Sequence, residues 1–139
     1  MYIRQLDNND YNEYILLLNE FRMTELTEEG FKTVLNNLCD FGKIWLLIDD
    51  KTHKIIGTST ILFEYKFINN GGVVSHIEDI IIKNEYKNKG CGRFLLHFLK
   101  KQAQEKGCYK MILNCANEYI NFYKKCGFVE SNTEMEIRF

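Results

Sequence analysis

HIEDIIIKNEYKNKGCGR, residues 76–93, joins a strand to the start of a helix. The apolar first half is typical of a strand, and it carries two adjacent acids, Glu78 and Asp79. After Gly90 the pattern changes to that of a long amphipathic helix. The first N–H groups of a helix have no partner within it, so a helix that starts here can bind a phosphate anion. The stretch therefore predicts a phosphate-bearing cofactor that is delivered to an acid/base site.

The composition predicts one globular domain spanning residues 1–139. Apolar residues make up 45% of the chain, and the formal net charge is −1. Binding to nucleic acid or to a membrane surface needs a basic field, so neither partner is predicted. No apolar run approaches the roughly 20 residues that a membrane span needs. The first residues lack a signal-peptide core, so we expect a cytoplasmic protein.

The cysteines indicate neither a disulfide framework nor a metal site. There are 5 of them, an odd number, and no two are spaced as Cys-x-x-Cys. We therefore expect free thiols and no metal.

Hydrophobic periodicity and turn residues predict a mixed α/β fold. The expected strands cover residues 2–6, 44–48, 54–67, 73–82, 110–115, the segment from 128 onward and 134–138. The expected helices are one that follows Asp7, one that Thr27 caps, and two over residues 90–106 and 117–126. Helices separate some strands and hairpins join others, which is typical of a mixed sheet covered by helices.

Two motifs give the chain a family resemblance. Lys87-x-x-Gly90-x-Gly92 lies between the predicted strand and helix, and NFYKKCGF occupies residues 121–128. Together they resemble the GNAT superfamily of acyl-CoA-dependent N-acetyltransferases. Further segments are similar to the glucosamine-6-phosphate N-acetyltransferases within it: EYKFI at 64–68, HIEDI at 76–80, GCYK at 107–110, LNC at 113–115 and EIR at 136–138.

The resemblance implies a reaction, a fold and an assembly. The fold is a twisted mixed sheet with splayed strands, flanked by helices. The reaction moves acetyl from acetyl-CoA to the amine of glucosamine 6-phosphate by direct attack in a ternary complex. It gives N-acetylglucosamine 6-phosphate for UDP-N-acetylglucosamine synthesis and needs no metal. The assembly is an intertwined homodimer with exchanged C-terminal strands.

The two adjacent acids pose a geometric question. Neighbours on a regular strand point to opposite faces, so only one of them could face a given cleft. A β-bulge would re-aim one, and bulges often lie beside active sites. The resemblance implies that this strand is bulged and splays from its neighbour, so that the pantetheine arm fits between them. It assigns both acids to the hydroxyls and the amine of the sugar.

The base that deprotonates the amine stays open. The family often has an acid at position 114, but this chain has Asn114, and an amide cannot act as a base. Glu78, Asp79 or water must then take the proton, while Asn114 can orient the amine. The resemblance places Tyr123 beside the departing CoA sulfur, where a phenol can stabilise or protonate the thiolate.

The remaining site residues follow from the same resemblance. For the cofactor they are Ile80, Ile81, Ile82, Lys87, Asn88, Lys89, Gly90, Cys91, Gly92, Arg93, Asn117 and Tyr123. For the acceptor they are Thr24, Lys66, Phe67, Ile68, Asn69, Glu78, Asp79, Asn114, Cys115 and Arg138, the last reaching the sugar phosphate from the second subunit. We assign His76 and His97 structural roles only.

Two alternatives to this hypothesis remain. An acetyltransferase that acts on a protein or another small amine would not need Lys66 and Arg138 as a phosphate clamp. A non-catalytic acyl-CoA-binding sensor would bind CoA without turnover, and Asn114 is the residue that favours it.

Overall fold

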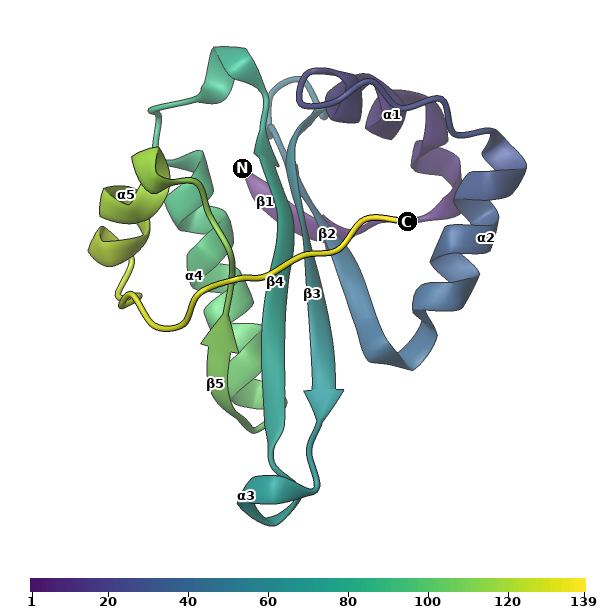
Figure 1. Ribbon diagram of the computed structural model, residues 1–139. Helices are drawn as coiled ribbons and strands as arrows, with labels where there is room; N and C mark the ends of the chain where they lie inside the picture. Colours follow the sequence, from purple (N-terminus) through teal and green to yellow (C-terminus); the bar gives the residue numbers. More distant parts are fainter.

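The computed structural model describes residues 1–139, apart from the side chain of Cys39, and it has a central five-stranded sheet in the order β1-β2-β3-β4-β5. Neighbouring strands are antiparallel except for β4 and β5, which are parallel (Figure 1). The strands are β1 (Tyr2–Gln5), β2 (Gly42–Ile48), β3 (Ile55–Tyr65), β4 (Val73–Ile82) and β5 (Cys108–Ile112). This mixed sheet confirms the predicted fold class.

Helices cover both faces of the sheet. On one face α1 (Tyr11–Asn19) and α2 (Glu28–Leu38) pack through Tyr14, Leu17 and Phe31. On the other face α4 (Cys91–Glu105) packs through Leu95 and Leu99. The short α5 (Ile120–Lys125) lies outside α4, and α3 (Ile68–Gly71) closes the β3–β4 hairpin (Figure 1).

Most predicted elements appear where the sequence places them. Thr27 accepts a hydrogen bond from the backbone N–H of Gly30, as expected of the residue that caps α2. The β3–β4 turn contains Asn69 and Asn70 at φ +54°, a left-handed conformation that asparagine tolerates better than most residues. The predicted helix over 117–126 is a 3₁₀ turn (Asn117–Tyr119) followed by α5.

The last sheet strand begins and ends earlier than predicted. We expected it at residues 110–115, but β5 runs from Cys108 to Ile112. Its limits follow from its pairing, because it lies beside β4 only from Val73 to His76. Beyond Ile112 the chain leaves β4, so the apolar residues that follow have no strand to pair with.

The prediction of two C-terminal strands is wrong for the single chain. No helix or strand follows α5, and the segment after Phe128 crosses the face of β4 and β3 rather than running along a sheet edge (Figure 1). A strand needs a neighbour to complete its hydrogen bonds, and this segment has none. Its apolar side chains stay exposed: Val129, Met135, Ile137 and Phe139.

None of the helices in residues 1–139 is both long enough and apolar enough to cross a bilayer.

The α4 side of the core provides a test of this packing. Leu95 has 0% exposure and packs against Ile61 and Ile77. We expect Leu95→Ala to lower the free energy of unfolding by about 2–5 kcal/mol, because it removes buried methyl groups and leaves a cavity. Urea unfolding followed by circular dichroism measures this change.

Leu16→Ala on α1 is the matched control, because Leu16 is 68% exposed. We expect it to change stability by no more than about 0.5 kcal/mol. Equal losses for the two variants would contradict the described core.

Candidate active site

Strand β4 carries a bulge at its acidic residues. Thr60 lies opposite Glu78, whereas Thr58 lies opposite Ile81. Two residues of β4, Asp79 and Ile80, therefore face the single residue Ser59 of β3. Asp79 has φ +50°, a left-handed conformation that costs about 1–3 kcal/mol and is often found at functional sites. The predicted β-bulge is confirmed.

The bulge places the two acids on the same face of the sheet. Ile77 and Ile80 both pack in the cluster around α4, so the two residues between them face the other way. There the negative charge of Asp79 adds to burial in raising the pKa of Tyr14, which belongs to α1. The hydroxyl of Ser59 donates a hydrogen bond to the backbone carbonyl of Glu78 at 3.1 Å and so supports the bulged conformation.

Strands β4 and β5 separate next to this bulge. Their pairing ends at His76 opposite Ile112, although β4 continues to Ile82. The last six residues of β4 therefore have no strand partner on the β5 side. Ile80, Ile81 and Ile82, predicted to offer backbone groups to the pantetheine arm, lie in this separated part.

The loop before α4 has the conformation that its glycines predict. Gly90 precedes the helix at φ +84°, and Asn88 is also left-handed at φ +60°. Lys87, Lys89 and Arg93 are exposed, and none of them pairs with an acid among the described side chains. The loop thus combines free N–H groups with uncompensated positive charge, which suits an anion.

The first two residues of α4, Cys91 and Gly92, serve the packing of the protein. A methyl group at Gly92 would lie 3.2 Å from the ring of Phe122, so glycine lets α5 approach the start of α4. Cys91 is buried at 3% exposure, and its thiol lies against the sulfur of Met1. Cys91 can therefore offer its backbone N–H to a ligand but not its side chain.

Tyr123 belongs to α5, the short helix outside α4. Its ring packs edge-on against Phe122 and Phe128, with centroids 5.1 and 5.9 Å away. Burial raises the pKa of Tyr123 to about 12, with a further contribution from the nearby Cys115 thiol. The phenol is therefore neutral at pH 7. Asn114, Cys115 and Asn117 are exposed on the segment between β5 and α5.

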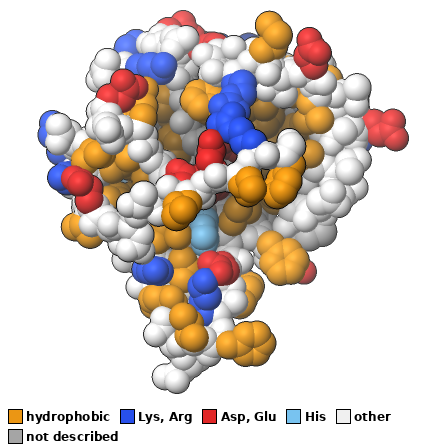
Figure 2. All heavy atoms as spheres, in the orientation of Figure 1, with side chains coloured by type: hydrophobic (Ala, Val, Ile, Leu, Met, Phe, Trp, Pro, Cys, Tyr) orange, Lys and Arg blue, Asp and Glu red, His pale blue; other side chains and the backbone are white. Residues whose placement is uncertain are grey.

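Glu78 is the more perturbed of the two acids. Partial burial raises its pKa, and the negative charges of Asp79 and Glu134 raise it further, while His76 opposes them. Glu134 belongs to the C-terminal segment, which crosses this face. Figure 2 shows acidic and basic side chains gathered where that segment passes over the sheet. A carboxyl with a raised pKa is suited to accept a proton near neutral pH.

Lys66 is held in a second charge cluster that the sequence did not predict. Glu64 forms an ion pair with Lys66 and also meets His76, with 2.9 Å between Oε2 and Nε2. These contacts lower the pKa of Glu64, Lys66 contributing most. Because a carboxylate can only accept, His76 must donate through Nε2. Glu64 and His76 lie on different strands, β3 and β4, so no spacing within one segment signals their contact.

The structure does not bring the hairpin residues to the two acids of the same chain. Tyr65 lies opposite Val73, five residues before Glu78 and so about 17 Å away along the strand. Lys66, Phe67, Ile68 and Asn69 lie at or beyond that point.

Two further predicted residues lie on other segments. Thr24 lies between α1 and α2, where its backbone N–H bonds Asn19 and its hydroxyl donates to the Arg22 carbonyl. Arg138 lies on the C-terminal segment, 3.0 Å from Glu136. Its side chain is 84% exposed, so it is open to a partner outside its own segment.

Known proteins resemble this chain over nearly its whole length. Glucosamine 6-phosphate N-acetyltransferase 1 of Oryza sativa subsp. japonica is 36% identical, and the match covers 99% of this chain and 86% of that protein. Glucosamine 6-phosphate N-acetyltransferase of Candida albicans is 34% identical over 98% and 94% of the two chains. The crystal structure of glucosamine-6-phosphate N-acetyltransferase from Arabidopsis thaliana has a TM-score of 0.92 and 31% identity, covering 99% and 97% of the two chains.

The family model of the acetyltransferase (GNAT) family matches residues 8–128. That range contains the bulged strand, the glycine loop and Tyr123. The chain belongs to the acetyltransferase (GNAT) family.

Proposed function

We propose that this protein transfers the acetyl group of acetyl-CoA to the amine of glucosamine 6-phosphate, giving N-acetylglucosamine 6-phosphate and CoA. The observation that carries the proposal is the bulge, which puts Glu78 and Asp79 on one face beside the separated strands β4 and β5. The relatives named above, which the chain matches over nearly its full length, support the choice of acceptor.

Acetyl-CoA fits the separated strands and the loop together. The pantetheine arm carries amide groups that need hydrogen-bond partners, and the free edge of β4 beyond His76 offers backbone groups. The pyrophosphate would lie on the N–H groups at the start of α4. This arrangement brings the thioester to the bulge, next to the two acids.

Glu78 is our choice as the base. At neutral pH the substrate amine is an ammonium, which has no lone pair and must lose a proton before it attacks. Burial and neighbouring negative charge raise the pKa of Glu78, so it accepts a proton more readily than an ordinary carboxylate. Asp79 is exposed and is better suited to hold the sugar hydroxyls.

Tyr123 stabilises the leaving thiolate by a hydrogen bond. An ordinary thiol has a pKa of about 8.5, whereas that of Tyr123 is raised to about 12. A phenol so much less acidic than the thiol does not give up its proton completely. The thiolate therefore leaves with the phenol hydrogen bonded to it, and its proton comes from water.

A homodimer would supply the phosphate clamp. Within one chain Lys66 lies far from Glu78, and Arg138 extends into solvent on a segment with exposed Met135, Ile137 and Phe139. Pairing of this segment with a second subunit would bury those apolar side chains and carry Arg138 to the other site. A cytoplasmic location is part of the same proposal.

The reaction itself is tested by release of free CoA thiol from acetyl-CoA, with glucosamine 6-phosphate, glucosamine and glucosamine 1-phosphate as parallel acceptors. We expect turnover with the 6-phosphate alone. Turnover on other amines would favour a different acceptor. Binding of acetyl-CoA without any turnover would favour the sensor.

Substitution of Arg138 tests the phosphate clamp and the dimer. We expect Arg138→Ala to raise the KM for the sugar phosphate by about tenfold or more, because a charge-assisted hydrogen bond is lost. The KM for acetyl-CoA should stay unchanged. Lys51→Ala in the exposed turn after β2 is the control.

Subunit mixing shows where Arg138 acts. In a heterodimer of Arg138→Ala and Glu78→Gln chains, one site regains both native residues if the arginine comes from the partner. Co-expressed chains should then recover activity that neither variant has alone. No recovery, with heterodimers present, would place the arginine in its own subunit.

Glu78→Gln should lower activity and raise stability. Without a base we expect kcat to fall by about 10²–10⁴. A carboxyl whose pKa is higher in the folded protein than in the unfolded chain stabilises the fold when protonated, and this contribution is lost as the pH rises above the unfolded value of 4.5. Glutamine keeps the neutral form, so the variant should melt at a higher temperature at pH 7.

The stability gain should disappear below about pH 4, where the wild-type carboxyl is protonated as well. Glu25→Gln is the control, because it makes the same chemical change at a carboxylate that is exposed to solvent. Thermal melts at pH 4 and pH 7 measure both effects. A lower melting temperature of Glu78→Gln at pH 7 would contradict the raised pKa.

A further inference from the structure

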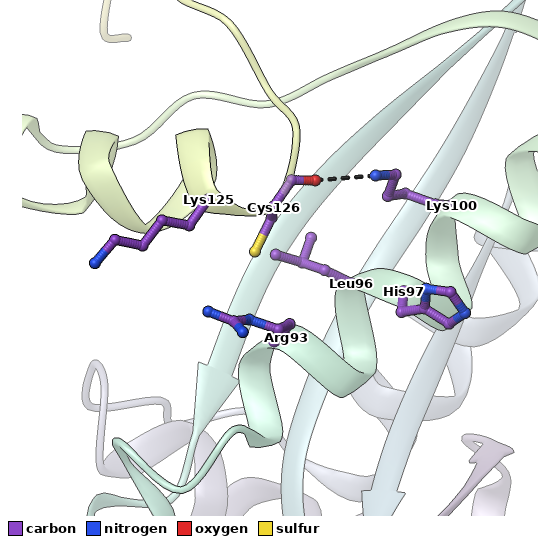
Figure 3. A pocket seen from close by; sticks show the side chains of 6 residues that line it. All are labelled: Arg93, Leu96, His97, Lys100, Lys125 and Cys126. Atoms are coloured by element: carbon purple, nitrogen blue, oxygen red, sulfur yellow. Dashed lines mark hydrogen bonds between the residues drawn. The ribbon is translucent and has the colours of Figure 1, made fainter.

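A cavity of about 200 Å³ lies between α4 and the end of α5. Figure 3 shows the six residues that line it: Arg93, Leu96, His97, Lys100, Lys125 and Cys126. Arg93, His97 and Lys100 follow one another at successive turns of α4, while Leu96 is buried beneath them. The cavity is thus basic at its rim and apolar at its floor.

Lys100 fixes the two helices that form the cavity. Its ammonium donates a hydrogen bond to the backbone carbonyl of Cys126 at 2.9 Å, just past the end of α5 (Figure 3). A cation at the end of a helix also interacts favourably with the helix dipole. This hydrogen bond therefore joins α4 to the end of α5, the two elements that form the cavity.

The positive charge around the cavity is not compensated. No acid lines it, and neither Arg93 nor Lys125 pairs with an acid among the described side chains. The neighbouring Lys124, in contrast, pairs with Glu130. Several cations around one hollow create a local potential that attracts an anion.

The cavity adjoins the loop proposed for the pyrophosphate. Arg93 lies in the first turn of α4, directly after that loop, and is the first cation of the cavity. Lys100 is two turns further along α4, about 10 Å away. In Figure 3 the guanidinium of Arg93 lies below the sulfur of Cys126, on the side toward Lys125. A ligand that leaves the loop along α4 would meet these groups next.

We propose that this cavity binds the phosphate monoester on the ribose of CoA, the 3′-phosphate, with Arg93 and Lys125 as its partners. The inference rests on the proposed use of acetyl-CoA. At pH 7 a phosphate monoester carries a charge of about −1.5 to −2, more than one cation neutralises. Arginine can bind it through two parallel hydrogen bonds, and lysine adds a point charge. Leu96 and Cys126 offer an apolar surface to the ribose.

The cavity has room for such a group. At about 30 Å³ for each water, its volume corresponds to about seven water molecules. The consequence is a selectivity that the loop cannot provide, because the pyrophosphate is the same with or without the 3′-phosphate. The protein should therefore distinguish CoA from 3′-dephospho-CoA.

Calorimetric titration of the full chain with CoA and with 3′-dephospho-CoA tests the site. We expect wild-type protein to bind CoA at least about tenfold more tightly. Lys125→Gln should weaken CoA binding by about fivefold or more and leave binding of 3′-dephospho-CoA unchanged. Adenosine 3′,5′-bisphosphate should compete with CoA better than adenosine 5′-phosphate, whereas inorganic phosphate at the same concentration should not compete.

Lys124→Gln is the matched control, because Lys124 adjoins Lys125 but does not line the cavity. It should leave the preference for CoA intact, and thermal melts establish that both variants are folded. Equal affinity of wild-type protein for the two ligands, or equal losses for both in Lys125→Gln, would overturn the proposed site. If neither ligand bound wild-type protein, the result would contradict both the proposed site and the proposed use of acetyl-CoA.

Discussion

One extra residue in β4 determines the geometry of the site. Side chains alternate along a regular strand, and this rule would have separated Glu78 from Asp79. Because Asp79 and Ile80 share a single partner on β3, the alternation shifts by one residue at that point. Ile77 and Ile80 then both reach the α4 core, and Ile81 reaches the core of α1 and α2. Hydrophobic clusters on both faces of the sheet thus hold the bulge in place, and both acids lie on the face of α1 and α2.

Negative and positive side chains lie in two neighbouring regions, one within β4 and one in the segment that follows it. Glu78, Asp79 and Glu134 make the face under the C-terminal segment negative, which favours a cationic amine. Lys87, Lys89 and Arg93, which follow the C-terminal end of the strand, favour an anionic cofactor. The amine of the acceptor is cationic and the pyrophosphate of the cofactor is anionic, so the amine is attracted to the acidic region and the pyrophosphate to the basic one. In the proposed reaction the reactive groups of the two substrates meet at the bulge, which belongs to the acidic region.

Local sequence patterns predicted the structural features that depend only on residues close together in the sequence. The strand over 73–82 and the helix after Gly90 follow from side-chain alternation, glycine and helix periodicity. The bulge between the two adjacent acids was implied by the family resemblance, because alternation alone would have placed the acids on opposite faces. The limits of β5 could not be predicted in this way, because they depend on how far β4 runs beside it. The prediction of the C-terminal strands was wrong for a related reason, because an apolar alternating segment becomes a strand only when a neighbouring strand is present to pair with it. The Glu64–His76 contact joins two strands, so no single segment could reveal it.

The close approach of Gly92 to Phe122 links two parts of the site that are thirty residues apart in sequence. Phe122 precedes Tyr123 and packs against its ring, so a side chain added at position 92 would displace the phenol as well as the loop. A methyl group at residue 92 already requires the Phe122 ring to shift by a few tenths of an ångström, so a larger side chain there favours a smaller residue at 122. Among homologues we expect the two positions to vary jointly in volume, as paired substitutions rather than independent ones.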